Sequence, residues 1–536
     1  MIAVSSGWVD AHQKTLLPEM FVELTYGATE PGLQQDASAS ASKEASFSEA
    51  ETIVNGEDKY SEQYGTLEHG LFGLNGNFSY FDGSPEDPGY VSEAMSDAVG
   101  AFATPPRITI DFSEQHIELV PGITITWSKV FDEWATDFRV TAYNAGQEVA
   151  QTEIHGNTSP ISPVWIDLVG YNKIAIDILA WSHPHRLARC IEVYLGIETV
   201  YTKNDLFGFE HTQSADLLSA ALPKNSITFR MRNEDNRWNP DNPIGSEKYL
   251  MERQEVKLRY GMDVDGKVEW IKGGTFWLSE WTTPSNGMEV SFTARDVVEF
   301  MNEVYNGPRS GTLYEIILSA LEQAELPVRE DGSVRYVIDD VLRTHTTDFS
   351  GDTSEYTISQ VIQMAANAGN CVMHQDRDGV FRVEPWSERY CGYMIEPKVS
   401  YSHPEYNISK PLKAVSSGYG DDGQRAVVTV GASGEVQTVD NPLIRTEADA
   451  IRVGNQVAKM LENRKVISGD FRADVRLDVL DNIIVTSKYA SNIIGVTEIS
   501  YSTTGGAFRG RYVGRVVSIN LKPADRRSNE FYSGEV

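Results

Sequence analysis

Cysteine is scarce in this 536-residue chain: Cys190, Cys371 and Cys391 are the only three, and none has a second cysteine at CxxC spacing. This set predicts neither a disulfide framework nor a structural zinc site. Long apolar runs are also missing, because no stretch approaches the roughly 20 apolar residues of a membrane-spanning helix. The first twenty residues lack the basic and apolar parts of a signal peptide. We therefore expect a protein that is made and folded in a reducing cytosol and has no membrane span.

The sequence also lacks the motifs of common catalytic sites. It contains no G-x-S-x-G elbow, H-E-x-x-H pair, P-loop or dinucleotide-binding glycine pattern. Carboxylates are abundant, but neighbours such as Asp132 and Glu133 stand in no cleft motif that would suggest a glycosidase pair. We therefore predict no catalytic residue, no cofactor and no enzymatic activity.

Positive charge is scarce relative to negative charge. The chain has 46 Lys and Arg against 77 Asp and Glu, and its formal net charge of -31 is spread along the sequence. Such a balance argues against a protein that grips nucleic acid by its phosphates. It fits a soluble assembly component, or a channel wall past which DNA moves without adhering.

Short alternating patterns are what the chain has in abundance. Between residues 226 and 296, apolar and polar residues alternate in runs separated by clusters of Asn, Pro, Gly and Asp. Such runs are typical of consecutive antiparallel strands, and Asp296 closes the series as the N-cap of a predicted helix. The strand MFVELTY, residues 20–26, is a candidate to pair with them. No reactive constellation occurs in 226–296, so we expect a scaffold, a small half-buried barrel.

Residues 107–202 carry a second group of strands. About seven alternating runs follow one another with regularly spaced turns, which predicts a β-sandwich. A basic segment, WSHPHRLAR, leads into the closing strand. With the strands and this basic segment in that order, residues 107–202 resemble the galactose-binding-like, or discoidin-like, jelly roll. The resemblance implies a domain that lies beside cell-surface sugars. The runs are RITIDF, ITITWSK, FRVTAYN, VAQTEI, VWIDLVG, KIAIDILAW and CIEVYLG.

Carbohydrate binding needs an aromatic face for the pyranose ring and planar polar groups for its hydroxyls. By their place in the strands, Trp127 and Trp165 are expected in the core. Two histidines flank Pro184 and could share a metal ion, but no third ligand lies at a recognised spacing, so we predict no metal site. The alternative, that both histidines are ordinary surface or turn residues, stays open. The candidate contacts are Trp134, Trp181, His183, His185 and Arg186, with Asp132 and Asn157 as polar partners.

Three helices are predicted after residue 300. GTLYEIILSALEQAE and TISQVIQMAANAGN repeat apolar residues at helical spacing, and a third helix is expected from Glu447 to Asn463. DRDG, residues 376–379, is expected to turn a hairpin. Residues 27–60, rich in Ala, Ser and Glu, are expected to form a solvated loop or arm.

These patterns predict a mainly β protein with α+β parts. At this length three or more domains are expected. The sections are 1–60, an N-terminal strand and arm with the first part of a barrel; 61–205, an inserted jelly-roll sandwich; 206–300, the remainder of that barrel; 301–409, a helical and hairpin section; and 410–536, a β-rich domain with one helix.

Several motifs stand in the order found in one family. They are the turn NEDNRWNP at 233–240, VKLRY at 256–260, TARD at 293–296 and the hairpin RDGVFRVEP at 377–385. In this order the chain resembles the baseplate-hub, or tail-tip hub, proteins of tailed phages, over about residues 1–60 and 200–525. One departure is RADVRLDVLD, which has Val475 where the family's turn usually has proline.

The resemblance implies a virion structural protein, assembled in the host cytoplasm, with two hub-type barrels per chain in a homotrimer. Its partners would be the tail tube or distal tail protein, other baseplate or tail-fibre proteins and, through the sandwich, a host cell-surface glycan. DNA would pass through the ring without specific nucleic-acid binding. Two alternatives stay open: a cell-surface carbohydrate-binding adhesin, and a cell-wall or polysaccharide depolymerase with an unrecognised site.

Overall fold

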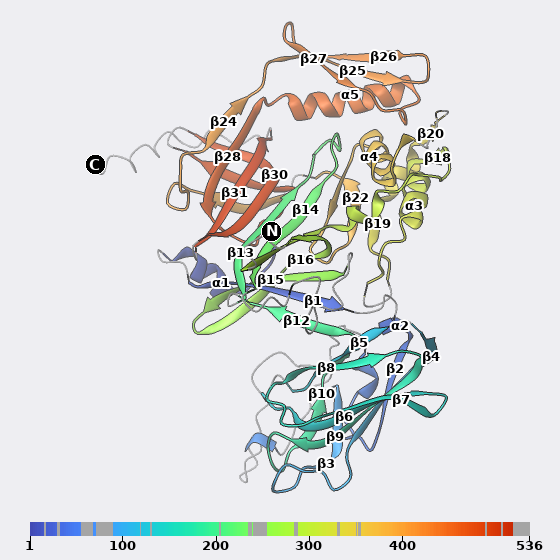
Figure 1. The fold of residues 1–536 in the computed structure, drawn as a ribbon. Helices are drawn as coiled ribbons and strands as arrows, with labels where there is room; N and C mark the ends of the chain where they lie inside the picture. Colours follow the sequence, from blue (N-terminus) through green and yellow to red (C-terminus); the bar gives the residue numbers. More distant parts are fainter. Residues whose placement is uncertain are drawn as a thin grey trace, which may run out of the picture.

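The computed structural model of the chain is mainly β with α+β parts, which confirms the predicted fold class. Figure 1 shows a sandwich at one end of the molecule and a large sheet with flanking helices in the rest. Among the residues it describes, no helix is both long and apolar enough to cross a membrane. The described residues are 1–14, 18–28, 33–54, 68–70, 89–117, 119–128, 131–202, 205–233, 238, 254–282, 288–329, 333–349, 351, 355–387, 389–487, 490–504 and 507–517.

One 13-stranded sheet organises the larger part of the molecule. Its order is β12-β1-β15-β16-β17-β14-β13-β30-β31-β28-β24, with β29 paired to β30 and β23 to β29. The strands are β1 (Met20–Ala28), β12 (Ile197–Tyr201), β13 (Leu206–Ser214), β14 (Lys224–Arg232), β15 (Glu255–Val264), β16 (Lys267–Thr282), β17 (Glu289–Arg295), β23 (Arg389–Ile395), β24 (Glu405–Ile408), β28 (Lys465–Arg472), β29 (Asp481–Thr486), β30 (Ser491–Thr504) and β31 (Ala507–Val516).

Strand β1 ties the N-terminal residues to two strands that are distant in the sequence, β12 and β15. It runs antiparallel to β15, with Leu24 opposite Leu258, and its other edge pairs with β12, where Leu24 lies opposite Tyr201. Val22 and Leu24 are buried on one face, as the two-residue period of a strand requires. The predicted pairing of MFVELTY with the 226–296 strands is thus confirmed. The chain leaves this sheet at β1 and returns beside it at β12.

The strands expected to form two barrels make one continuous sheet instead. Strand β13 pairs with β14 on one side and with β30 on the other, so the N-terminal and C-terminal groups of strands share an edge. Within the described residues the pairing path ends at β12 and at β24 without closing. An edge strand that finds a partner no longer exposes unpaired backbone groups, which favours joining the two groups over leaving both open.

The sandwich packs a five-stranded sheet, β2-β4-β9-β6-β7, and a three-stranded sheet, β11-β5-β8, around one core. A short pair, β3 and β10, adds to it, and Trp127 and Phe138 meet edge-to-face inside. The strands are β2 (Ala37–Ser42), β3 (Tyr90–Met95), β4 (Arg107–His116), β5 (Val120–Thr126), β6 (Ala135–Asn144), β7 (Gln147–Ile154), β8 (Ile161–Leu168), β9 (Tyr171–Trp181), β10 (Leu187–Cys190) and β11 (Glu192–Tyr194).

Strand β2 differs from the sequence prediction. Residues 27–60 were predicted to be a solvated arm, but Ala37–Ser42 pairs along its whole length with β4, and Ala39 is 5% exposed. The segment ASASAS has low strand propensity, and its neighbours in the sheet override that preference. Small side chains suffice here because β2 is an edge strand of its sheet.

The helical section follows the predicted pattern. Thr312 and Thr357 each form a capping box with the residue three positions later, which fixes the starts of α3 and α4. Asp296 caps a short 3-10 helix, and burial raises the pKa of this carboxyl to about 7. The helices are α1 (Ser6–Gln13), α2 (Leu33–Asp36), α3 (Leu313–Gln323), α4 (Ile358–Ala368), α5 (Glu447–Leu461) and the 3-10 helices η1 (Ala50–Thr52), η2 (Glu68–Gly70), η4 (Val297–Met301) and η5 (Asp340–Thr344).

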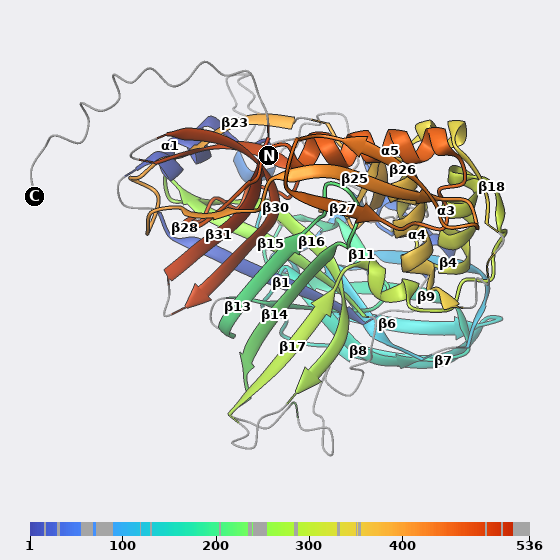
Figure 2. The same ribbon diagram turned by 90° about the horizontal axis from the view of Figure 1, so that it is seen from above.

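Small sheets complete the helical section and the C-terminal part. Helix α5 packs against β25 and β26 of a three-stranded sheet, as the view from above shows (Figure 2). The predicted DRDG hairpin joins β21 to β22. The strands are β18 (Ser310–Thr312), β19 (Tyr336–Ile338), β20 (Thr346–Asp348), β21 (Cys371–Gln375), β22 (Phe381–Pro385), β25 (Leu412–Tyr419), β26 (Gln424–Thr429) and β27 (Glu435–Val439).

Arg377, in the DRDG turn, joins this hairpin to the large sheet. The side chain is buried and donates hydrogen bonds to the backbone oxygens of Lys272 (2.8 Å), Val475 (2.8 Å) and Leu477 (3.1 Å). Its Nε donates to Asp478 at 2.9 Å. One guanidinium therefore satisfies acceptors from β16 and from the segment after β28. That segment is the one with Val475 in place of the family's proline.

A buried histidine lies at the junction of the two strand groups. His211 is fully buried on β13, with its Nδ1 at 2.7 Å from the Tyr260 hydroxyl and its Nε2 at 3.0 Å from Asn225 Oδ1. Burial lowers the pKa of His211 to about 4. The ring is therefore neutral near pH 7 and acts as a hydrogen-bonding core residue.

Candidate functional site

Glu133 is the centre of the candidate site in the sandwich. It lies between β5 and β6, is 2% exposed, and is held by a two-way backbone pairing with Ser128. Its carboxylate accepts hydrogen bonds from Trp181 Nε1 at 3.0 Å and from Arg186 Nε at 3.1 Å. A buried carboxylate needs such partners, because an unpaired charge away from water is costly.

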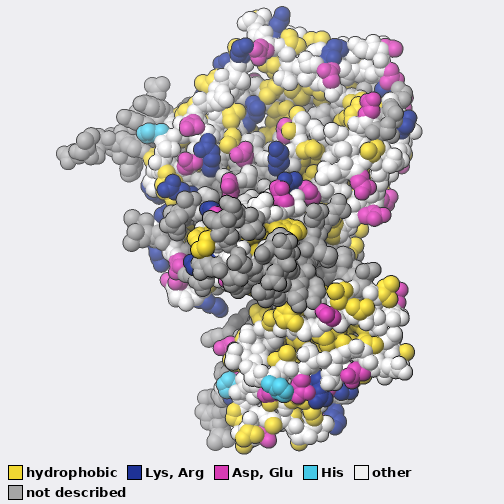
Figure 3. Space-filling model, in the orientation of Figure 1, with side chains coloured by type: hydrophobic (Ala, Val, Ile, Leu, Met, Phe, Trp, Pro, Cys, Tyr) yellow, Lys and Arg dark blue, Asp and Glu magenta, His cyan; other side chains and the backbone are white. Residues whose placement is uncertain are grey.

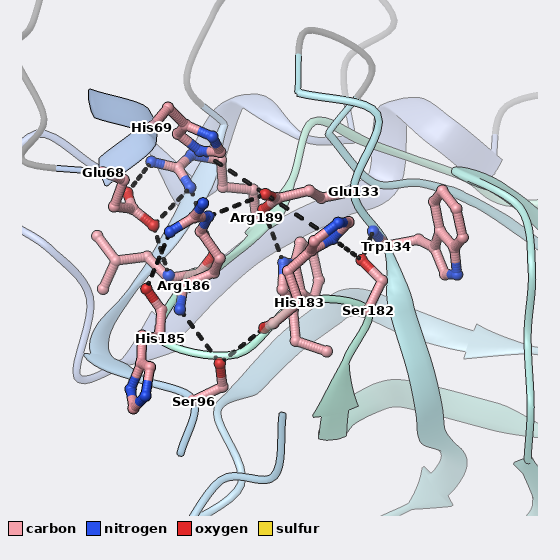
Figure 4. Close-up of polar contacts among 12 residues, drawn as sticks. Glu68, His69, Ser96, Glu133, Trp134, Ser182, His183, His185, Arg186 and Arg189 are labelled. Atoms are coloured by element: carbon pink, nitrogen blue, oxygen red, sulfur yellow. Dashed lines mark hydrogen bonds and ion pairs between the residues drawn. The ribbon is translucent and has the colours of Figure 1, made fainter. Parts of the chain in front are cut away.

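A second buried ion pair, Glu68 with Arg189, lies beside the pair of Glu133 with Arg186. Glu68 and Arg189 are 3% and 2% exposed, and Arg189 Nη2 donates to Glu68 at 2.6 Å. The Arg189 guanidinium lies over the Phe131 ring at 5.0 Å, and His69 stacks on the same ring with centroids 3.9 Å apart. The two acid–base pairs, Glu133 with Arg186 and Glu68 with Arg189, thus lie side by side (Figure 4).

His69 has an unusual environment. Its Nε2 is buried and makes no hydrogen bond within the described part of the chain, while Glu133 Oε1 lies 3.8 Å away. Burial lowers the pKa of His69, so the neutral ring is favoured. A neutral imidazole offers one donor and one acceptor. The unpaired Nε2 of His69 therefore lies beside the Glu133 carboxylate, within the described part of the chain.

Three of the predicted contact residues, Trp181, His183 and Arg186, converge on Glu133, and Trp134 and His185 do not. Arg186 and His183 point toward it, and His183 Nδ1 lies 3.9 Å from its Oε1 (Figure 4). The Arg186 side chain is 27% exposed and that of His183 is 51% exposed, so both are open to solvent. His185 has a left-handed backbone, φ 55°, and its ring points away.

Trp134 and Trp181, the two tryptophans predicted to contact a sugar, do not lie where stacking on a sugar ring would need them. Trp181 is 2% exposed, packs edge-on against Trp127, and donates to Glu133, so it positions the carboxylate instead of presenting a face. Trp134 is partly buried, and its Nε1 donates to the Asn157 oxygen. Its ring points away from Glu133 (Figure 4). Trp165, expected in the core, is 39% exposed, whereas Trp127 is buried as predicted.

The two predicted polar partners have structural roles. Asp132 occupies a left-handed turn position, φ 50°, just before Glu133. The Asn157 amide donates to the Ala135 oxygen at 2.8 Å and to Ser162 Oγ at 2.8 Å, which fixes the turn before β8. Neither side chain is needed at the Glu133 cluster.

Five residues of the cluster were missed by the sequence analysis: Glu68, His69, Phe131, Glu133 and Arg189. They come from segments more than 50 positions apart, so no local spacing connects them. The cluster offers both kinds of hydrogen-bonding group: the buried carboxylate accepts, the arginine donates, and the two histidines donate or accept, which suits a neutral hydroxyl-rich ligand. Within the described residues no group of three or more His, Cys, Asp or Glu side chains is placed to hold a metal ion.

By sequence, no known protein family and no curated protein matches this chain. Among solved structures it is similar to the prophage MuSo2 43 kDa tail protein from Shewanella oneidensis (TM-score 0.41, 11% identity, 59% of this chain and 94% of that chain). It is similar to the tail protein from Neisseria meningitidis MC58 (TM-score 0.39, 10% identity, 60% and 94%). It is also similar to the family 32 CBM from C. perfringens NanJ, solved in complex with galactose (TM-score 0.21, 14% identity, 33% and 99%). Phage tail proteins are thus among its structural neighbours, at identities near 10%.

Proposed function

We propose that the protein is a non-enzymatic structural component of a phage-type tail tip or baseplate hub. The observation that carries this proposal is the continuous sheet, which contains the strands bearing the hub-like motifs VKLRY and TARD and joins them through β1 to the N-terminal segment. The buried contacts of Arg377 tie the hub-like hairpin RDGVFRVEP to that sheet. A rigid, cooperatively packed body of this kind suits an assembly role.

In this proposal the sandwich is inserted between β1 and β12, and it includes β2 from the segment predicted to be an arm. Strands β1 and β12 pair with each other, so the chain leaves the large sheet for the sandwich and returns to it at neighbouring positions. A domain placed this way does not interrupt the sheet. The body would form a homotrimeric ring with the tail tube or distal tail protein, beside other baseplate or tail-fibre proteins.

The charge of the chain supports a role beside passing DNA. The formal net charge is -31, and on the face shown in Figure 3 acidic and basic side chains are interspersed above the sandwich. A net negative body repels phosphates at distances within the screening length of about 8 Å. Electrostatics therefore favours a wall that DNA does not bind.

For the sandwich we propose a carbohydrate contact centred on Glu133, Arg186 and His183. The support is geometric: a fixed buried carboxylate lies next to two solvent-accessible nitrogen-bearing side chains. Such planar polar groups match the hydroxyls of a sugar. A cell-surface adhesin would share this contact, and a depolymerase would in addition turn over polysaccharide.

Replacing Arg186 with alanine is expected to weaken glycan binding by at least about ten-fold, because a charge-assisted hydrogen bond contributes about 1.5–3 kcal/mol. The measurement is binding of the full chain to arrayed galactose-, glucose- and N-acetylglucosamine-terminated glycans. Arg139→Ala is the matched control, since Arg139 pairs with Glu153 on β7, away from Glu133. Absence of wild-type binding to every glycan would refute the carbohydrate contact and leave the assembly role standing.

A further inference from the structure

A groove lies where the C-terminal sheet meets the helical section. It has a volume of about 430 Å³. Strand β27 and the two residues after it line one side, and α4 and α5 line another through Gln363, Met364, Val457 and Leu461. The loop before β14 closes it, and Arg515 of β31 forms part of its wall.

Arg515 is the chemically unusual residue of this groove. Of the described residues that line it, Arg515 is the only cation and Asp440 the only carboxylate. Asp440 is already paired with Arg425 at 2.6 Å. The negative charge of Asp216 acts to raise the pKa of Arg515, but the Asp216 carboxylate accepts a hydrogen bond from the Leu218 backbone N–H at 2.8 Å.

Arg515 is therefore partly buried and lacks a direct anionic partner among the described residues. Its guanidinium makes no ion pair or side-chain hydrogen bond within the described part of the chain, and burial lowers its pKa. The buried arginines Arg377 and Arg476 differ, because each contacts a carboxylate closely. Partial burial without an anion in contact is unfavourable for a cation, so Arg515 favours a negatively charged group in the groove.

The strand beside the groove offers a second means of binding. β27 is the end strand of the order β26-β25-β27, so one of its edges is unpaired among the described residues. Its residues 435–438 are exposed. An unpaired edge accepts an extended segment by backbone hydrogen bonding, while side chains of that segment enter neighbouring pockets.

We propose that this groove binds an extended, acidic segment of another protein and that Arg515 pairs with a carboxylate of that segment. The occupant is narrow, because about 430 Å³ accommodates a few side chains and no subunit face. It is acidic, because Arg515, the only cation among the described lining residues, has no ion-pair partner, whereas Asp440 is paired with Arg425. It is extended, because the edge of β27 can pair only with a strand.

Two synthetic peptides test this pairing: acetyl-TVTETVT-amide and its glutamine counterpart, acetyl-TVTQTVT-amide, titrated calorimetrically into the full chain. We expect the glutamate peptide to bind about ten-fold more tightly, as one charge-assisted hydrogen bond predicts. Arg515→Gln should abolish the difference between the peptides. Arg509→Gln, on the same strand but stacked on Tyr401 outside the groove, should preserve it.

The variants also separate a binding role from a structural one. Because Arg515 has no partner to lose, Arg515→Gln is expected to leave the melting temperature unchanged or to raise it. Equal binding of both peptides by the wild type, or no binding up to about 1 mM, would overturn the proposal. So would self-association of the wild type that Arg515→Gln removes in sedimentation velocity, because the occupant would then be a second copy of this chain.

Discussion

Replacing Arg377 with methionine is expected to lower the free energy of unfolding by about 3–5 kcal/mol. The guanidinium is buried and contacts three backbone oxygens and Asp478. Methionine fills similar space but donates no hydrogen bond, so these acceptors would be left without their donor in the interior. The carboxylate of Asp478 would lose its partner at the same time.

Urea denaturation followed by tryptophan fluorescence measures this loss. Arg511→Met is the control, because Arg511 pairs with Asp470 at 3.2 Å and both side chains are 48% exposed. An exposed pair contributes about 0–1 kcal/mol. A loss below about 1 kcal/mol for Arg377→Met would show that the hairpin is not tied to the large sheet by this residue.

Trp277→Ala is expected to have an effect of similar size, about 3–5 kcal/mol. Trp277 lies on β16 of the large sheet but is 1% exposed in the core of the helical section. It meets Phe300 edge-on at 5.6 Å, and Arg335 lies 5.2 Å over its ring. The truncation would open a cavity between the two parts, so both should be destabilised together.

The matched control is on the same strand. Trp270 is 37% exposed, with Arg259 5.3 Å over its ring, so Trp270→Ala should cost about 1 kcal/mol or less. Calorimetry of the full chain distinguishes the outcomes. If Trp277→Ala shifted one transition and left the rest of the large sheet unaffected, the sheet and the helical section would not form one cooperative body.

Local patterns predicted the parts of the fold that depend on local causes. Helices α3 and α4 form where apolar residues repeat at helical spacing, and MFVELTY pairs with β15 because its alternation fits a half-buried strand. Strand β2 could not be predicted, since its pairing with β4 depends on the partner and its own propensity is low. The pairing of β13 with β30 could not be predicted either, because the alternation of apolar residues in a strand does not indicate which strands pair with its two edges.

The candidate site shows the same division. His183 and Arg186 were found because one short basic segment carries both. Glu133 was passed over among 77 acidic residues, since only its burial and its contact with Arg186 distinguish it. Trp181 was chosen for its aromatic face, but the core that accepts this ring comes from distant strands, and burial turns it into a support for Glu133.

The central claim is that this chain is a ring-forming component of a tail tip. Mass photometry of the purified full chain, alone and with a phage tail tube protein, tests that claim most directly. The proposal predicts a species containing three copies of the chain, either alone or on the tube protein. A chain that stays strictly monomeric in both samples would contradict it.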